Sequence, residues 1–160
     1  MKHRLRPATP ADAAWQLAIY AGTRADELAL TGWPIEQCEA FMRQQHEAQQ
    51  RHYALHFPRS VCQLILVQGD TVAGRLWLDE RADRLHILDI ALLPAWRGLG
   101  VGTRCLQALA AQGRCLSIQV ELHNPARRLY ERLGFVPEGE PVGLHQAMLR
   151  PAAHTEECLP

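Results

Sequence analysis

The chain has 160 residues, which suits one compact domain and is too short for two ordinary ones. Its 48% hydrophobic and 21% charged residues are typical of a globular protein and exclude a disordered or fibrous chain. Lys plus Arg and Asp plus Glu number 17 each, so no global field directs the chain to nucleic acid or to an acidic membrane. Any charged partner must therefore be recognised locally.

The N-terminus begins like a signal peptide but does not continue as one. The basic start over residues 1–6 is followed by a segment that Asp12, Gln16 and Arg24 interrupt. No run approaches the roughly 18 apolar residues that a membrane span needs. We therefore expect a cytoplasmic protein with one domain over residues 1–150 and a loose tail over residues 151–160.

The first third of the chain predicts one short strand and two helices. A strand over residues 3–6 is followed by Thr9, which can cap a helix that runs to about Tyr20. Residues 21–33 are expected to be irregular. Pro34 then opens a second helix with a periodic apolar face.

The middle of the chain predicts three antiparallel strands in succession. Apolar runs over residues 60–68 and 71–79 are joined by Gly69-Asp70, a typical two-residue hairpin turn. A third strand is expected over residues 85–93. Together they form a meander.

After Pro94 the pattern becomes helical and then alternates. The predicted elements are a helix over residues 102–113, a strand over 115–122, a helix over 125–134, and strands near Phe135 and over 144–149. The strand–helix–strand passage over residues 85–122 should be a right-handed crossover. This order predicts an α/β (α+β) fold in which helices flank a mixed, mostly antiparallel sheet.

The most informative run lies between the third strand and the next helix. It reads Pro-Ala-Trp-Arg-Gly-Leu-Gly-Val-Gly-Thr over residues 94–103. Three alternate glycines let the backbone present consecutive N–H groups, and the helix N-terminus adds about half a positive charge. With Arg97 as a fixed cation and the Thr103 hydroxyl as a donor, this loop is suited to bind a pyrophosphate. A glycine-rich turn without a ligand is the plainer interpretation.

A dinucleotide-binding fingerprint is a second alternative for the same loop. Glu121 ends the next strand, where such folds place an acidic residue that holds the ribose. However, the third glycine falls one place early, and the segment before Leu85 has the pattern of a meander. Too little chain remains after Glu121 for the second half of that fold.

Two motifs at a suitable separation point to one family. The run RGLGVG over residues 97–102 matches the signature Q/R-x-x-G-x-G/A, and NPARRLYERLGF over residues 124–135 is similar to a block near the end of such domains. On these motifs the chain resembles the GNAT N-acetyltransferase superfamily. The resemblance implies a central sheet whose middle strands splay apart.

The resemblance also implies acetyl-CoA as cosubstrate. Its pyrophosphate would lie on the glycine loop, and its pantetheine arm would lie between the splayed strands, where its amides pair with backbone near Leu92 and Leu93. The implied cofactor-binding residues are Leu92, Leu93, Arg97, Gly98, Leu99, Gly100, Val101, Gly102, Thr103, Asn124 and Arg127. Family members place the asparagine seven residues before the tyrosine, and here His123 occupies that place, so Asn124 and His123 are both open as the contact.

The family's usual acid is the tyrosine of the last helix, which is Tyr130 here. An unperturbed phenol is a poor acid toward a thiolate, so either Arg127 or Arg128 lowers its pKa, or Tyr130 only donates a hydrogen bond to the sulfur. Tyr130 also lies on the apolar stripe of its helix, so a packing role is an alternative. The oxyanion would be held by a backbone N–H near Leu93.

Asp89 is the leading candidate for the general base. A carboxylate inside the apolar run over residues 85–93 is costly to bury, which favours a functional role. A structural role for Asp89 is an equal alternative. The alternative bases are Glu27, Glu36, His86, Glu121 and His123.

The acceptor is expected to be a small-molecule or peptide amine. The stretch over residues 24–33 is the natural wall of its site, where Trp33 and Glu27 could flank a cation. Trp33 beside Pro34 could instead act as a hydrophobic staple for the second helix.

Two functional hypotheses remain: an acetyltransferase, or a non-catalytic acetyl-CoA-binding or protein-interaction domain of the same fold. His52 and His56 are one helical turn apart but have no third ligand nearby in sequence, so we predict no metal. We also predict no nucleic acid or membrane partner, and a homodimer is an open possibility. The sequence does not identify the acceptor.

Overall fold

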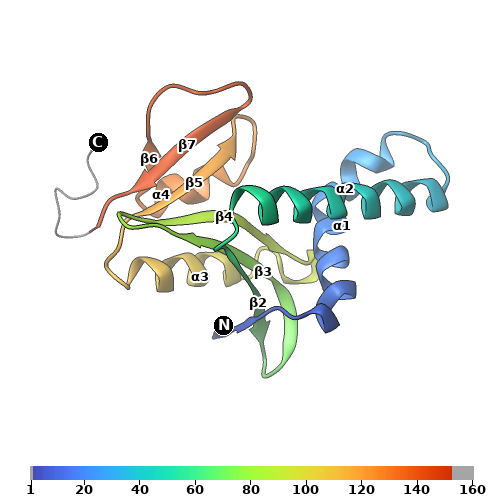
Figure 1. Cartoon of the computed structure of the whole chain (residues 1–160), viewed down its shortest axis with the longest axis horizontal. Helices are drawn as coiled ribbons and strands as arrows, with labels where there is room; N and C mark the ends of the chain where they lie inside the picture. The colour runs from blue at the N-terminus through green and yellow to red at the C-terminus, as the bar shows by residue number, and fades with distance from the viewer. Residues whose placement is uncertain (1, 153–160) are drawn as a thin grey trace.

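The computed structural model describes residues 2–152, so most of the predicted loose tail lies outside the described residues. A single seven-stranded sheet has the order β1-β2-β3-β4-β5-β7-β6 (Figure 1). Its strands are β1 (His3–Pro7), β2 (Val61–Val67), β3 (Thr71–Glu80), β4 (Leu85–Leu92), β5 (Leu116–Glu121), β6 (Val136–Pro137) and β7 (His145–Arg150). Every neighbouring pair is antiparallel except β4 and β5. The predicted fold class and the predicted meander are confirmed.

Four α-helices cover the two faces of this sheet: α1 (Ala13–Ala29), α2 (Ile35–His56), α3 (Val101–Ala110) and α4 (Arg127–Arg132). The buried side chains of α3 and α4 pack with Ile65, Ile87 and Ile118 in the largest core cluster, and we call this side the α3 face. Ile19 of α1 packs with Leu64 and Leu66 on the opposite side, which we call the α1 face.

Helix α1 is longer than predicted, and the expectation of irregular chain over residues 21–33 is wrong. The helix continues to Ala29, so only residues 30–34 connect it to α2. Leu28 is buried with Tyr20 and Met42, and this packing between the two helices stabilises the extra turns. Pro34 precedes the first residue of α2, as predicted.

The pairing between β4 and β5 stops early. It joins only Leu85 to Leu116, His86 to Ser117 and Ile87 to Ile118, although both strands continue beyond this point. Figure 1 shows β5, β7 and β6 gathered on one side of β4, with β2 and β3 on the other. The two central strands therefore splay apart toward their carboxyl ends, as the family resemblance implied.

A β-bulge in β4 decides which face Asp89 occupies. Trp77 of β3 pairs with Asp89 and the next residue of β3 pairs with Ile87, so Leu88 is an extra residue. Ile87 lies on the α3 face, and beyond the bulge Ile90 packs against the same cluster. Asp89 is consequently directed to the α1 face.

No helix within residues 2–152 is long and apolar enough to cross a membrane. Across the same residues, no group of three or more His, Cys, Asp or Glu side chains could hold a metal ion.

His86 lies on the last stretch of sheet before the splay and is buried there. Its Nδ1 is 2.7 Å from the Ser117 hydroxyl oxygen, across the β4–β5 pair. Burial is the main cause that lowers the pKa of His86 to about 4, and the nearby charge of Arg81 lowers it further. His86 is therefore neutral near pH 7 and bonded to the neighbouring strand, and a group with so low a pKa is a weak proton acceptor.

Stability should fall as the pH drops toward this value. The unfolded chain takes up a proton on His86 below about pH 6.5 and the folded protein does so only near pH 4, which costs about 2 kcal/mol at pH 5. Urea unfolding at pH 7.5 and 5.0 should show that loss in the wild type and a correspondingly smaller loss in His86→Gln. Exposed His56→Gln is the control and should keep the full difference; an unchanged difference in His86→Gln would contradict the assignment.

Candidate functional site

The glycine loop has the backbone geometry of an anion site. Gly98 and Gly100 have φ angles of 72° and 83°, in the left-handed region that favours glycine. A side chain at either position would point into open space, and helix α3 begins directly afterwards at Val101. The unpaired N–H groups of the first turn and the positive end of the helix dipole are thus exposed to an approaching anion.

Arg97 is held by two backbone carbonyl groups. Its Nε donates to the Leu92 oxygen at 3.1 Å, and one terminal nitrogen donates to the Gly22 oxygen of α1 at 2.9 Å. The guanidinium group therefore joins the loop to the end of β4 and to helix α1. Its charge lies beside the loop as predicted, but two of its N–H groups donate to carbonyl groups of the protein and not to a ligand.

The end of β4 offers backbone groups to the splay. Leu93 donates its N–H to the Ala73 oxygen at 2.8 Å, and its carbonyl accepts from Trp96 at 2.9 Å. By the alternation of an antiparallel ladder, the N–H groups of Ile90 and Leu92 then point away from β3, toward the gap beside β5. The N–H of Leu93 is engaged in the sheet, so the predicted backbone contact near Leu93 falls to Ile90 and Leu92, and it stays a prediction.

Tyr130 lies on α4 and is 6% exposed, with its ring edge-on to Phe135. Within residues 2–152 its hydroxyl has no hydrogen-bond partner. Burial raises the pKa of Tyr130 to about 12, and the charge of Asp89 contributes to the increase. Tyr130 and Asp89 therefore interact electrostatically, although they come from opposite sides of the splay.

Neither arginine next to Tyr130 activates it. Arg127 donates to Glu131 at 3.0 Å, and neither arginine is among the causes that shift the Tyr130 pKa. The predicted lowering of this pKa by Arg127 or Arg128 is wrong. What remains is a neutral phenol that can donate a hydrogen bond.

Asp89 is ion-paired with a buried arginine. Its Oδ2 is 2.7 Å from Nε of Arg75, which is 1% exposed, while the Asp89 side chain is 23% exposed. Asp89 therefore has a structural partner, the side chain of Arg75, and the alternative of a structural role is supported. The ion pair fixes one carboxylate oxygen, and the side chain stays partly exposed.

Arg75 also donates hydrogen bonds to both helices of the α1 face. It donates to Gln16 of α1 at 3.2 Å and to Gln49 of α2 at 2.7 Å. Tyr53, one turn after Gln49, donates to the bulge carbonyl of Leu88 at 3.3 Å. Burial raises the pKa of Tyr53 to about 12, with a contribution from Asp89.

Sequence reasoning missed this polar cluster. Arg75 interrupts an apolar strand just as Asp89 does, and pairing the two charges was the available signal. Gln16, Gln49 and Tyr53 carried no comparable signal, because polar residues on long helices are usually solvated.

The two residues predicted to flank the acceptor, Glu27 and Trp33, each contact another side chain. Glu27 is 65% exposed and pairs with Arg24 at 2.9 Å, whereas Trp33 packs edge-on against Phe41. The two side chains do not form a cation cage together. Trp33 behaves as the hydrophobic contact for α2 that was the alternative.

The remaining candidates lie at the surface. The Oδ1 atom of Asn124 accepts from the Ala126 N–H at 2.9 Å, so this side chain caps the turn before α4. His123, Glu36 and Glu121 are exposed. The open choice between Asn124 and His123 as a cofactor contact stays a prediction.

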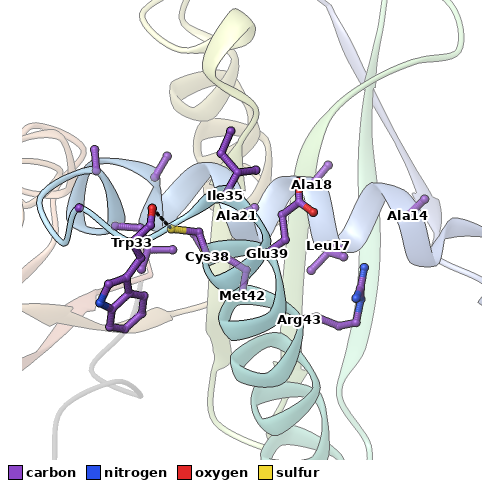
Figure 2. Close-up of a pocket in the computed structure, with 14 residues that line it drawn as sticks. Ala14, Leu17, Ala18, Ala21, Trp33, Ile35, Cys38, Glu39, Met42 and Arg43 are labelled. Atoms are coloured by element: carbon purple, nitrogen blue, oxygen red, sulfur yellow. Dashed lines mark hydrogen bonds between the residues drawn. The ribbon is translucent and has the colours of Figure 1, made fainter.

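An apolar groove lies between the two N-terminal helices. It has a volume of about 650 Å³, and Figure 2 shows its lining in the angle where α2 crosses α1. Leu17, Ala18 and Ala21 come from α1, and Cys38 and Met42 come from α2. Trp33 is the one predicted site residue on its wall.

Comparison with known proteins agrees with this geometry. Residues 25–135 match the profile of the Acetyltransferase (GNAT) family. Comparison of the sequence with curated proteins gave no significant match.

Several solved structures share the fold. The PaiA N-acetyltransferase of Thermoplasma acidophilum, solved in complex with coenzyme A, has a TM-score of 0.68 at 15% identity, and the match covers 94% of this chain and 99% of that one. A histone acetyltransferase HPA2-related acetyltransferase of Corynebacterium glutamicum has a TM-score of 0.68 at 21% identity, covering 98% and 99%. The ribosomal-protein-S18-alanine N-acetyltransferase of Escherichia coli has a TM-score of 0.60 at 19% identity, covering 99% of both chains.

The profile match spans more than half of the chain and includes the glycine loop, the splayed strands and the tyrosine block. Enzymes of this family take their acetyl group from acetyl-CoA. This chain belongs to the GNAT acetyltransferase family.

Proposed function

We propose that this protein transfers the acetyl group of acetyl-CoA to a primary amine by direct attack within a ternary complex. The observation that supports this most is the gap between β4 and β5 after the Ile87–Ile118 pair. An anion-binding loop lies at the outer end of β4, and Asp89 and Tyr130 approach from either side of the gap. The donor site and two polar groups thus lie around the splay.

Acetyl-CoA fits this cleft in one direction. Its pyrophosphate is placed on the backbone N–H groups from Gly98 to Thr103, where the positive φ of Gly100 keeps the approach open. The pantetheine arm then runs along β4 and pairs with the backbone of Ile90 and Leu92, taking the place of the missing strand. The thioester reaches the level of Asp89 and Tyr130.

Asp89 is proposed to bind the incoming amine and to receive its proton. Arg75 fixes the orientation of the carboxylate through a charged hydrogen bond. The acceptor attacks as the neutral amine, after its ammonium proton has passed to solvent. The attacking nitrogen becomes far more acidic as its bond to the thioester carbon forms, so transfer to Asp89 is favourable at that stage.

Tyr130 is proposed to stabilise the leaving thiolate by a hydrogen bond. A phenol with a pKa of about 12 and a thiol near 8.5 differ by about 5 kcal/mol in proton affinity, so full proton transfer before C–S cleavage is unfavourable. A neutral hydroxyl without another partner can instead donate to the sulfur as negative charge develops there.

Tyr130→Phe tests this role because it removes only the hydroxyl. We expect kcat to fall about 10²-fold, since a donor to a developing anion is lost. The calorimetric Kd for acetyl-CoA and the thermal unfolding midpoint should stay close to those of the wild type. The assay is thiol release with the best amine of a panel of primary amines, and an unchanged kcat would rule out the role.

Asp89→Asn tests the proposed base. We expect kcat/KM for the amine to fall by roughly 10²–10⁴-fold while the Kd for acetyl-CoA is retained. The variant should also be destabilised by a few kcal/mol, because Arg75 loses its counter-charge in a buried position.

Glu121→Gln is the matched control for Asp89→Asn, since Glu121 is an exposed carboxylate at the end of β5. Glu121→Gln should leave kcat/KM unchanged. If Glu121→Gln lost activity while Asp89→Asn kept it, the base would be Glu121 and not Asp89. Acetyl-CoA binding by the wild type without thiol release for any amine would favour the non-catalytic alternative.

A further inference from the structure

Gly74 of β3 lies opposite Leu92, the last residue of β4. A β-carbon at position 74 would be 2.1 Å from the Ala91 carbonyl oxygen and 2.9 Å from the Leu92 Cα. Both are backbone atoms that cannot rotate away. The two strands therefore approach each other at this point more closely than any residue with a side chain would allow.

Two features of the sheet produce this close approach. A bulge in β3 makes Ala73 an extra residue against β2, which turns the backbone of Gly74 toward β4. The N–H of Leu93 donates to Ala73, so the neighbouring Gly74–Leu92 pair is a non-hydrogen-bonded pair, the closer of the two kinds.

The same contacts hold the end of β4 on the β3 side. Leu93 is bound to Ala73 at 2.8 Å, and Leu92 accepts from Arg97 at 3.1 Å, while β5 has already left β4 after Ile87. The space beside Leu92 thus exists because β4 stays against β3 and does not follow β5.

We propose that Gly74 is a positioning residue for acetyl-CoA, which sets the width of the gap that takes the pantetheine arm. This inference rests on the proposed function. A methyl group at position 74 pushes Ala91 and Leu92 toward β5, into the space of the pantetheine. The glycine loop is joined to Leu92 through the flexible Arg97 side chain, so a small shift of Leu92 leaves the N–H groups of the loop in place.

Two ligands, one with and one without the pantetheine arm, distinguish a narrowed gap from a general loss of structure. In Gly74→Ala we expect the Kd for acetyl-CoA to rise roughly tenfold or more, while the Kd for 3′-phospho-ADP, which has the diphosphate but no pantetheine, changes by less than about twofold. Calorimetric titration of each variant with both ligands gives the two values. Gly69→Ala, in the β2–β3 turn where a side chain would be strained but meet no atom, should leave both unchanged.

Leu93→Pro provides a second variant if Gly74→Ala does not fold. Leu93 has a φ of −60°, which proline adopts, so the change removes mainly the N–H that ties β4 to Ala73. It should weaken acetyl-CoA binding selectively in the same way. Equal losses for both ligands, or wild-type affinity for acetyl-CoA in the folded variant, would overturn the role of Gly74, whereas a wild type that binds neither ligand would refute the proposed function itself.

Discussion

The early end of the pairing between β4 and β5 is the constraint on which the site depends. Two parallel strands that stayed paired would satisfy each other's backbone groups and leave no cleft. Here the pairing ends after Ile87, and the N–H groups of Ile90 and Leu92 point away from β3 without a strand partner. The unsatisfied groups of one strand become the binding surface for a ligand that carries amides of its own. Three contacts, at Gly74, Leu93 and Arg97, keep β4 in place without its neighbour.

The Arg75–Asp89 pair links this cleft to the helices above it. A buried arginine is costly unless its N–H groups are satisfied, and Arg75 meets this requirement with Asp89, Gln16 and Gln49. Helices α1 and α2 are thereby fixed over the α1 face by the group that also orients Asp89. The position of the proposed base and the position of the helices that border it are set by one side chain.

The parts of the site that are local in sequence could be predicted, and those that depend on tertiary contacts could not. The glycines of the loop need positive φ angles, and their spacing before an amphipathic helix was sufficient to identify the anion site. The face of Asp89 depends on the bulge at Leu88, which nothing in an apolar run reveals. Helix α1 was predicted too short because its second half is stabilised by packing on α2, which is remote in sequence.

The roles given to Arg97, Leu93 and Trp33 were altered for a similar reason. Each has a chemical group that suits a ligand, and each uses that group on the protein itself. Whether such a group binds a ligand or another part of the protein depends on residues remote in sequence. The Gly22 carbonyl, for example, accepts a hydrogen bond from Arg97.

The central claim is that the glycine loop and the splay bind acetyl-CoA, and a matched pair of glycine variants tests it most directly. Gly100 and Gly113 both have a φ of 83°, and a β-carbon at either would have no atom within 4 Å, but only Gly100 lies at the N-terminal end of α3. Calorimetric titration with acetyl-CoA should show binding by the wild type and by Gly113→Leu, and a loss of roughly tenfold or more in Gly100→Leu. Wild-type affinity in a folded Gly100→Leu would contradict the assignment of the loop.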